Sequence, residues 1–480
     1  MASNRELRTP FEPLDQLKLT WTHLKIWYLS GAGFFTDAYD LFVISAVLTV
    51  LTSYVVPGFE ELHGPNAAFW TGLLGSAALW ATIAGQLLFG FLGDMLGRKY
   101  LYGVEAAILT FGAILSAVAP NLLWLIAART FLGFGIGGDY PISATIMSEY
   151  SNVKDRGKLV ALVFANQGLG ILASVGVALL SVALLPPDIA WRVMLGVGAI
   201  PAASVIYLRR KIPETPRFAL LVKGDVEEAR RAARIFGVDI NAPAKAEGLT
   251  MREFPSVNWK ILIGTTVPWF LMDIALYGTG VYSGSVVTSI MGPANSILQT
   301  IFYQGLPFLV GFPGYFVAAL LLDKLGRKPI QTLGFAAMAA IYLAVSLVVV
   351  QVGKSVELLI PASAALAVYS LSYFFINFGP NTTTFVIPAE VYPTRYRTTG
   401  HGISAAAGKL GAAITTLFFP SLLYAVGISH LLQMLAAVSI IGIPITLLAL
   451  PEPKAMSLEL VSGEYKYITP VSAPIGGTSS

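Results

Sequence analysis

Twelve long apolar runs constrain the fold of this chain more than any other feature of its sequence. Each is about 20 residues or longer, enough for an α-helix to cross roughly 30 Å of hydrocarbon. They lie near residues 25–54, 69–92, 99–119, 122–149, 158–186, 190–209, 260–290, 297–322, 330–351, 356–388, 398–427 and 430–450. Only 12% of the 480 residues are charged, against roughly 25% in soluble domains. The sequence therefore predicts an all-α membrane protein with twelve transmembrane helices.

The distribution of Lys and Arg predicts the orientation. The basic segments "GDMLGRKY", "SNVKDRGK", 210–258, "DKLGRKP" and "YPTRYRTTG" fall on one side, whereas the opposite loops offer little beyond Arg192 and Lys354. By the positive-inside rule, both termini and the long central loop are expected in the cytoplasm. The N-terminal 25 residues lack the order of a cleaved signal peptide, so we expect the first span to be retained. The net charge of +4 then reflects topology and lipid headgroups, and nothing indicates nucleic acid.

The spans form two related halves. A D-x-x-G-R-K core follows both span 2, in "GDMLGRKYLYG", and span 8, in "LDKLGRKPIQT". Likewise "SEYSNVKDRGK" after span 4 is echoed by "AEVYPTRYRTTG" after span 10. We therefore expect a duplication, with a cytoplasmic segment 1–24, six-helix bundles at 25–209 and 259–450, a linker at 210–258 and a cytoplasmic tail at 451–480. A surface helix is predicted near 225–236 of the linker, either a spacer or a regulatory element, and the tail is predicted to be disordered.

The paired loops also suggest a latch. Their Gly97 and Gly326 permit a tight turn, and the adjacent Arg and Lys can reach carboxylates or helix C-termini on the inner face. A purely topogenic loop is the alternative. The latch is predicted to use Asp94, Arg98, Asp323 and Arg327, together with Glu149 beside Arg156 and Glu390 beside Arg397.

These motifs resemble the major facilitator superfamily. More narrowly, the chain is similar to its phosphate:proton symporters in "FFTDAYDLFVIS", "GIGGDYPISATIMSEY", "FANQGLG", "NFGPNTTTFVIPAEVYPTRYRTTGHGISAAAGKLGA" and the "PETPR" after span 6. The resemblance covers most of the chain and is weakest in the linker. It implies the major facilitator fold, two six-helix bundles around a central cavity lined by spans 1, 4, 7 and 10.

Ionisable residues inside the spans are costly, so they mark a pathway. Asp37 and Asp40 share one face of span 1, and two carboxylates this close do not both ionise easily. They are candidate proton carriers, and a structural carboxylate is the alternative. Asp139, in the Gly- and Pro-containing part of span 4, is predicted to pass the proton to the cytoplasm, and a static role in helix packing is the alternative. Lys409 is a counter-ion for the span 1 acids or an attraction for an anion. The resemblance favours a coupling role beside Asp37, and a purely structural salt bridge is the alternative. The role of Glu105 stays open, and Arg129 is interpreted as structural.

The predicted substrate site centres on span 7. Its Trp269, Asp273 and Tyr277 follow at intervals of four on one helical stripe. Such a stripe alone is typical of packing, but the acid between the aromatics favours a site. In the resembled family, the positions of Tyr140, Gln167 and Asn381 contact phosphate.

An acidic cavity can accept dihydrogen phosphate because this ion carries hydroxyl donors. Asp273 would accept from such a hydroxyl, whereas fully deprotonated sulfate would leave two acceptors facing each other. The sequence thus predicts proton-coupled import of inorganic phosphate by a multi-pass plasma-membrane protein, expected as a monomer and without cofactor or metal.

Other functions are less well supported. A proton-coupled sugar or polyol symporter also suits acids, aromatics and amides, and an organic-cation carrier suits Asp273 between aromatics. A phosphate sensor would need a large cytoplasmic output element, and no filter segment of a channel is visible. With no Cys, four His and no nucleophile motif, an enzyme is not indicated.

Overall fold

The computed structural model describes residues 9–242, 258–352, 355–466 and 468. Parts of the predicted N-terminal segment, linker and tail lie outside these ranges, and so does Lys354. Within them, eleven helical stretches are long and apolar enough to cross a membrane. The last, Thr394–Ala449, contains a backbone break at Gly427, where φ is 73°, so it crosses twice. The prediction of twelve transmembrane helices is confirmed.

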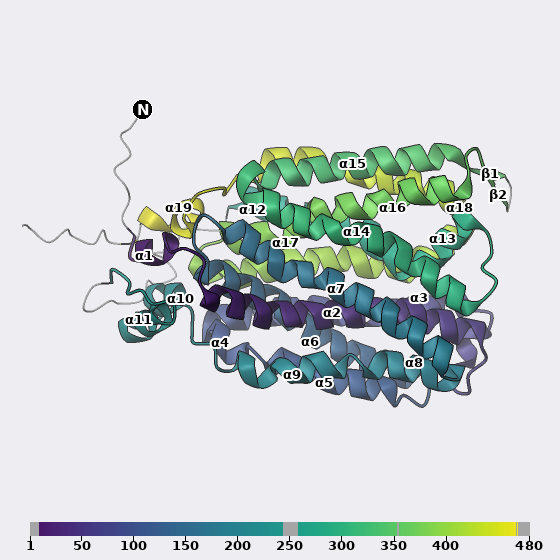
Figure 1. The fold of residues 1–480 in the computed structure, drawn as a ribbon, viewed down its shortest axis with the longest axis horizontal. Helices are drawn as coiled ribbons and strands as arrows, with labels where there is room; N and C mark the ends of the chain where they lie inside the picture. Colours follow the sequence, from purple (N-terminus) through teal and green to yellow (C-terminus); the bar gives the residue numbers. More distant parts are fainter. Residues whose placement is uncertain (1–8, 243–257, 353–354, 467, 469–480) are drawn as a thin grey trace, which may run out of the picture.

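The helices run along one axis in two groups (Figure 1). The first six crossings are α2 (Trp21–Ser53), α3 (Ala67–Leu96), α4 with α5 (Arg98–Leu101 and Val104–Ala117), α6 (Leu122–Tyr150), α7 (Arg156–Leu184) and α8 with α9 (Pro187–Gly196 and Ala199–Arg209). The other six are α12 with α13 (Trp259–Val281 and Ser283–Met291), α14 (Ile297–Leu325), α15 (Arg327–Val348), α16 with α17 (Ala362–Phe378 and Pro380–Val391) and the two parts of α18 (Arg397–Ala449). Helices α3 and α7 of the first group pack against α18 and α14 of the second.

Short elements cap the two ends of this bundle. At one end, the linker end, lie α1 (Glu12–Asp15), α10 (Pro216–Leu221), α11 (Val226–Arg234), η2 (Thr394–Tyr396), α19 (Leu458–Ser462) and η3 (Glu464–Lys466). At the other, the hairpin end, lie η1 (Glu60–His63) and an antiparallel pair, β1 (Val349–Val352) and β2 (Ser355–Leu358), in which Val349 faces Leu358. The prediction of a disordered tail is wrong for 458–466, which form α19 and η3.

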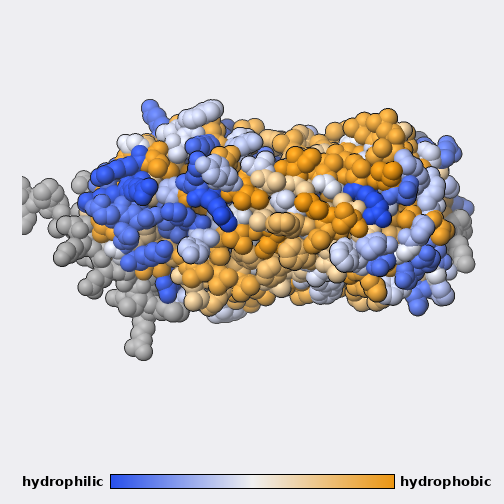
Figure 2. Space-filling view, turned by 90° about the horizontal axis from the view of Figure 1, so that it is seen from below, coloured by the Kyte–Doolittle hydropathy of each residue, from blue (hydrophilic) through white to orange (hydrophobic). Residues whose placement is uncertain are grey.

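The surface agrees with a transmembrane bundle. Figure 2 shows a broad hydrophobic band between two hydrophilic ends. Helices suit this band because lipid cannot pair with backbone N–H and C=O groups, which must therefore bond within the segment. Prolines inside α6, α12 and α14 interrupt that ladder locally, and these are the helices that carry Asp139, Asp273 and a buried tyrosine, Tyr315.

Candidate functional site: a charged centre between two aromatic layers

An ion pair lies at the centre of the bundle. Asp273 on α12 accepts from Lys409 on α18, with Oδ2 and Nζ 2.9 Å apart. Both side chains are at most 2% exposed. The second carboxylate oxygen, Oδ1, has no hydrogen-bond partner within the described residues. A buried carboxylate with one satisfied and one free oxygen is a prepared acceptor, because a lone pair without a donor is unfavourable away from water.

Lys409 corrects one prediction. One expected role is that of a counter-ion for the span 1 acids, but the ion-pair partner of Lys409 in the structure is Asp273 rather than Asp37 or Asp40. Its ammonium also lies 4.9 Å from the ring centre of Tyr140 and 4.5 Å from that of Tyr277. Aromatic faces attract cations at such distances. One cation therefore gathers three of the predicted substrate residues around it.

Two amides meet on a tyrosine opposite this pair. Gln167 on α7 and Asn381 on α17 both donate to the hydroxyl oxygen of Tyr315, at 3.1 and 3.0 Å. Gln167 belongs to one half of the chain and Asn381 to the other. Sequence reasoning missed Tyr315, because a tyrosine in an apolar span carries no signal of its own.

The remaining predicted substrate residue, Trp269, lies on the same stripe of α12. Its ring centre is 6.3 Å from that of Tyr140 and 5.6 Å from that of His401. The structure therefore brings all six predicted substrate residues, which are Tyr140, Gln167, Trp269, Asp273, Tyr277 and Asn381, into one buried region.

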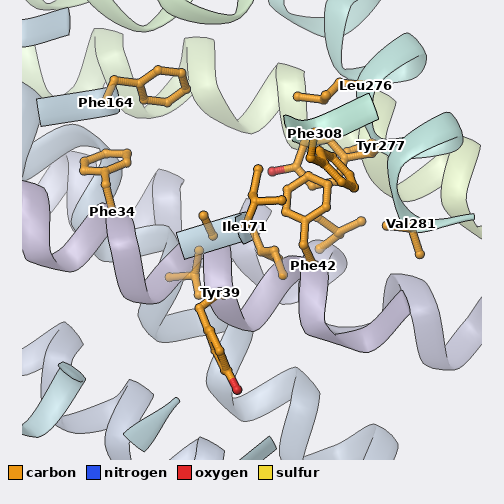
Figure 3. Packing of buried hydrophobic residues seen from close by; sticks show 14 of the residues in the cluster. Phe34, Tyr39, Phe42, Phe164, Ile171, Leu276, Tyr277, Val281 and Phe308 are labelled. Atoms are coloured by element: carbon orange, nitrogen blue, oxygen red, sulfur yellow. The ribbon is translucent and has the colours of Figure 1, made fainter. Parts of the chain in front are cut away.

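Two aromatic layers flank this region, and Figure 3 shows Phe34 and Phe164 of one and Phe42, Tyr277 and Phe308 of the other. Towards the hairpin end, Phe42 stacks on Tyr277 at 5.2 Å and contacts Phe308 edge-on at 5.3 Å. Towards the linker end, Phe34 lies 5.6 Å from Phe164, and both contact Phe385 of α17, at 4.8 and 4.6 Å. Each layer combines residues of both halves, so relative motion of the halves would open it.

Beyond the first layer, a cavity of about 350 Å³ opens towards the hairpin end. Its lining is rich in hydroxyl groups and includes Ser45, Thr49, Ser53 and Gln304. Gln304 Nε2 donates to Thr49 Oγ1 at 2.6 Å and joins the two halves there. The charged centre is thus buried, and this cavity lies on its hairpin side.

A second buried group of charges lies within the first six helices. Arg209, the last residue of α9, pairs with Glu105 at 2.7 Å and with Asp139 at 2.9 Å. All three side chains are fully buried. Asp139 has no basic neighbour in the sequence, and the structure supplies one from a distant helix. Arg209 was missed because it lies in an Arg-Arg-Lys run typical of topogenic charge.

Asp37 and Asp40 have different surroundings despite their shared face. Asp37 lies within electrostatic reach of Asp139 and Arg209, whereas Asp40 lies against Gly198. Arg129 donates to the backbone oxygen of Asp40 at 2.5 Å. No carboxylate oxygen of either aspartate has a hydrogen-bond partner in the described part of the chain.

The paired loops are joined to the opposite halves at the linker end. Asp94 accepts from the backbone N–H groups of Thr398 and Thr399 at the start of α18, at 3.2 and 2.7 Å. Asp323 accepts in the same way from Gly157 and Lys158 at the start of α7, at 3.1 and 2.8 Å. Carboxylates are favoured at helix N-termini, where N–H groups are unpaired and the dipole is positive.

The arginines of these loops occupy equivalent positions. Arg98 pairs with Asp94 at 3.3 Å, and Arg327 pairs with Asp323 at 2.9 Å. The preceding glycines, Gly97 and Gly326, have φ of 107° and 101°, a conformation that side chains disfavour. The two loops therefore have the same local structure, once in each half of the chain.

The predicted pairings of the inner glutamates need correction. Glu149 pairs with Arg98 at 3.2 Å and with Arg397 of the other half at 2.7 Å, rather than with Arg156. Glu390 pairs with Arg327 at 2.7 Å, rather than with Arg397. Spacing along the chain misled here because these side chains pair between helices.

Arg156 instead joins an ionic network of the terminal segments. It lies 3.4 Å from Asp15 of α1, which also pairs with Arg217 of α10 at 2.7 Å. Arg217 in turn pairs with Glu459 of α19 at 2.7 Å. The segment before the first span, the linker and the tail are thus held together by charge.

The tail also reaches the start of α18. Glu464 accepts from Thr394 N–H at 2.5 Å and lies 3.6 Å from Arg397. Burial raises the pKa of Glu464 to about 7, and Arg397 opposes this shift. Among the residues that the structure describes, no group of three or more acidic, His or Cys side chains is placed to hold a metal ion.

Comparison with known proteins matches this chain to a family of transporters and to relatives that are named as transporters. The model of the family described as "Sugar (and other) transporter" matches residues 28–465. The "Probable inorganic phosphate transporter 1-6" of Arabidopsis thaliana is 37% identical, over 96% of this chain and 98% of its own. The "Inorganic phosphate transporter 1-4" of the same plant is 38% identical, over 96% of each chain. The "Inorganic phosphate transporter 1-1" of Oryza sativa subsp. japonica is 37% identical, over 94% of this chain and 95% of its own.

Among solved structures, the proton:xylose symporter XylE bound to 6-bromo-6-deoxy-D-glucose has a TM-score of 0.77 at 20% identity. The match covers 92% of this chain and 99% of that one. XylE from E. coli in a partially occluded inward open conformation has a TM-score of 0.71, over 91% of this chain and 99% of that one, at 20% identity. Identity this low supports the fold alone.

Proposed function

The chain belongs to the Sugar (and other) transporter family and to the major facilitator superfamily, and from this premise we propose that it imports inorganic phosphate together with protons by alternating access. It is a multi-pass membrane protein and a transporter rather than an enzyme. The naming of its relatives as inorganic phosphate transporters, at 37 to 38% identity over nearly the whole chain, supports phosphate as the substrate.

One observation carries the chemistry of this proposal. Asp273, beside Lys409, has one carboxylate oxygen that accepts a hydrogen bond and one that does not. The ammonium offsets the charge of an anion, while the free Oδ1 accepts from a phosphate hydroxyl. Tyr140, Tyr277 and the amides of Gln167 and Asn381 are donors for the remaining oxygens. Such a site prefers dihydrogen phosphate to sulfate, because sulfate would leave Asp273 facing an acceptor, at a cost of about 1 to 3 kcal/mol.

The buried acids of α2 and α6 supply the coupling in this proposal. Asp37 and Asp40 have no compensating donor on their carboxylates, and an isolated charge in the membrane costs several kcal/mol. Both are therefore neutral in the enclosed state, which means that each holds a proton. We assign Asp37, Asp40 and Asp139 to proton transfer and Lys409 to its coupling with phosphate.

The linker-end ion pairs act as the inner gate of the transporter. Asp94, Arg98, Asp323, Arg327, Glu149, Glu390 and Arg397 join the halves or hold the loops that do so. Arg156 contributes by tying the N-terminal half to α1 through Asp15. Release of these contacts would open the phosphate path at the linker end.

The cellular setting follows from the charge distribution. Lys and Arg gather in the linker-end loops, which supports a cytoplasmic position for this end. We propose the plasma membrane as the location and a monomer as the working unit. With more than one proton carried per phosphate monoanion, inward flow would also draw on the membrane potential, about 2.3 kcal/mol per charge per 100 mV.

Uptake of radiolabelled phosphate into proteoliposomes tests the function. With an inward proton gradient, phosphate should accumulate, and a protonophore or the Asp273→Asn substitution should abolish this. Labelled sulfate, glucose and xylose serve as controls. Sugar uptake without phosphate uptake would move the assignment to a sugar symporter, and phosphate binding without accumulation would favour a sensor.

A further inference from the structure

We propose that Arg209 is a positioning residue for proton transfer, which holds Asp139 ionised until a proton arrives and then remains with Glu105. This inference rests on the proposed proton coupling and adds a residue to it. It concerns the step between Asp37 and Asp139.

The guanidinium of Arg209 is fixed by contacts on every side. Nη1 lies 2.7 Å from Glu105 of α5, and Nη2 lies 2.9 Å from Asp139 of α6. Its Nε donates to the backbone oxygen of Leu29 on α2 at 3.1 Å. The ring of Tyr102 covers one face at 4.5 Å. An arginine keeps its charge in such surroundings, whereas a carboxylate can gain a proton.

Gly33 of α2 lets the Arg209–Asp139 pair approach this helix close to Asp37. A side chain at Gly33 would collide with both Asp139 and Arg209. Gly33 is four residues before Asp37, so Asp37 follows one turn later on the same face. Both oxygens of Asp37 lack a hydrogen-bond partner among the described residues. Asp37 therefore lies next to the Arg209–Asp139 pair without being held by the guanidinium.

Charge balance gives Arg209 its role. The charged or titratable groups that face it are Glu105 and Tyr102 from the α4–α5 region, Asp139 from α6 and Asp37 from α2, with Asp40 one turn further. Arg209 donates to both carboxylates, one through each Nη atom, so Asp139 stays ionised and able to accept a proton.

The transfer step is balanced. The O–H bond of protonated Asp37 breaks, and its proton forms an O–H bond on Asp139. Asp37 becomes a carboxylate and Asp139 a neutral acid. Arg209 keeps Glu105 as its counter-ion, so the group gains no net charge. Ser143, which donates to Asp139 Oδ1, stays in reach of either form.

The experiment separates proton-driven transport from exchange. Purified variants in proteoliposomes are assayed for phosphate accumulation under a proton gradient and for phosphate counterflow without one. We expect Arg209→Gln to lower the ratio of accumulation to counterflow at least tenfold and to flatten its dependence on external pH. Arg209→Lys, which keeps the charge, should recover part of the ratio. Arg192→Gln is the matched control, because Arg192 lies in the same span but donates to the backbone oxygens of Ala117 and Ala119 and covers the ring of Trp191, away from the buried acids.

If Arg209→Gln fails to fold, the charge-balanced Glu105→Gln/Arg209→Gln variant replaces it with the same expected fall in ratio. An unchanged ratio, whether both activities persist or both fall together, would overturn the inference and leave Arg209 as a structural residue. Absence of phosphate uptake by the unsubstituted protein would instead contradict the proposed function.

Discussion

Glu149 of the first six helices and Arg397 of the last six form a buried ion pair of 2.7 Å across the linker end. The same carboxylate oxygen lies 3.2 Å from Arg98. One glutamate thus joins a loop of its own half to the start of α18 in the other half. Removal of its charge leaves two buried guanidinium groups without that partner, and the closed linker end loses stability.

We therefore expect Glu149→Gln to shift the protein towards a conformation open at the linker end. The chain has no cysteine, so single reporters can be introduced without background. Ser148 donates to the backbone oxygen of Ala389 in the other half at 2.8 Å and is buried. Maleimide labelling of Ser148→Cys should rise several-fold in the Glu149→Gln variant.

Ser53, which lines the hairpin-end cavity, provides the opposite reporter. Labelling of Ser53→Cys should fall in the Glu149→Gln background as the hairpin end closes. Equal labelling of both reporters with and without Glu149 would show that the ion pair does not control the gate.

The Asp273–Lys409 pair predicts that stability can be recovered without recovery of transport. Lys409→Met leaves Asp273 buried without its cation, and loss of one partner of a buried pair costs about 3 to 5 kcal/mol. Asp273→Asn/Lys409→Met removes both charges and should recover most of that loss in thermal unfolding. Neither variant should accumulate phosphate. A double variant as unstable as Lys409→Met would contradict this account.

The sequence predicted the spans and the central residues because both depend on local signals. Hydrocarbon requires long apolar helices, and a charge inside one is conspicuous. Asp273 and Lys409 were identified in this way, and the repeated D-x-x-G-R-K core revealed the paired loops.

Pairing between helices was not predictable from one sequence. Arg397 pairs with Glu149 and Lys409 with Asp273, although 248 and 136 positions separate them. Packing of distant helices decides such contacts. The order of α19 was missed for a related reason, because its stability comes from contacts such as the Arg217–Glu459 pair rather than from an apolar pattern of its own.

Tyr315 should matter for phosphate affinity although it was not predicted. Tyr315→Phe removes the hydroxyl that accepts from Gln167 and Asn381. A buried amide without its partner costs about 1 to 3 kcal/mol, and the freed amides lose their orientation towards the site. We expect the KM for phosphate to rise about tenfold, which corresponds to 1.4 kcal/mol.

A tyrosine on the same helix provides the matched control. Tyr303 accepts from Gln299 at 2.7 Å, which is a comparable bond outside the central region. Tyr303→Phe should leave the KM unchanged. A similar rise in KM for both variants would indicate a general effect on α14.

Docking of the tail should weaken as the pH rises. Burial raises the pKa of Glu464 from 4.5 to about 7 in the docked tail, so the docked state binds a proton more tightly than the free tail does. The stabilising effect is therefore complete below about pH 4.5 and disappears as the pH passes through about 7. The protection factors for hydrogen exchange of 458–466, which correct for the intrinsic rise of amide exchange with pH, should fall between pH 6 and 8. Glu464→Gln, which mimics the protonated side chain, should show protection in this segment with no such pH step, whereas higher protection at pH 8 than at pH 6 in the unsubstituted protein would reverse the assigned sign.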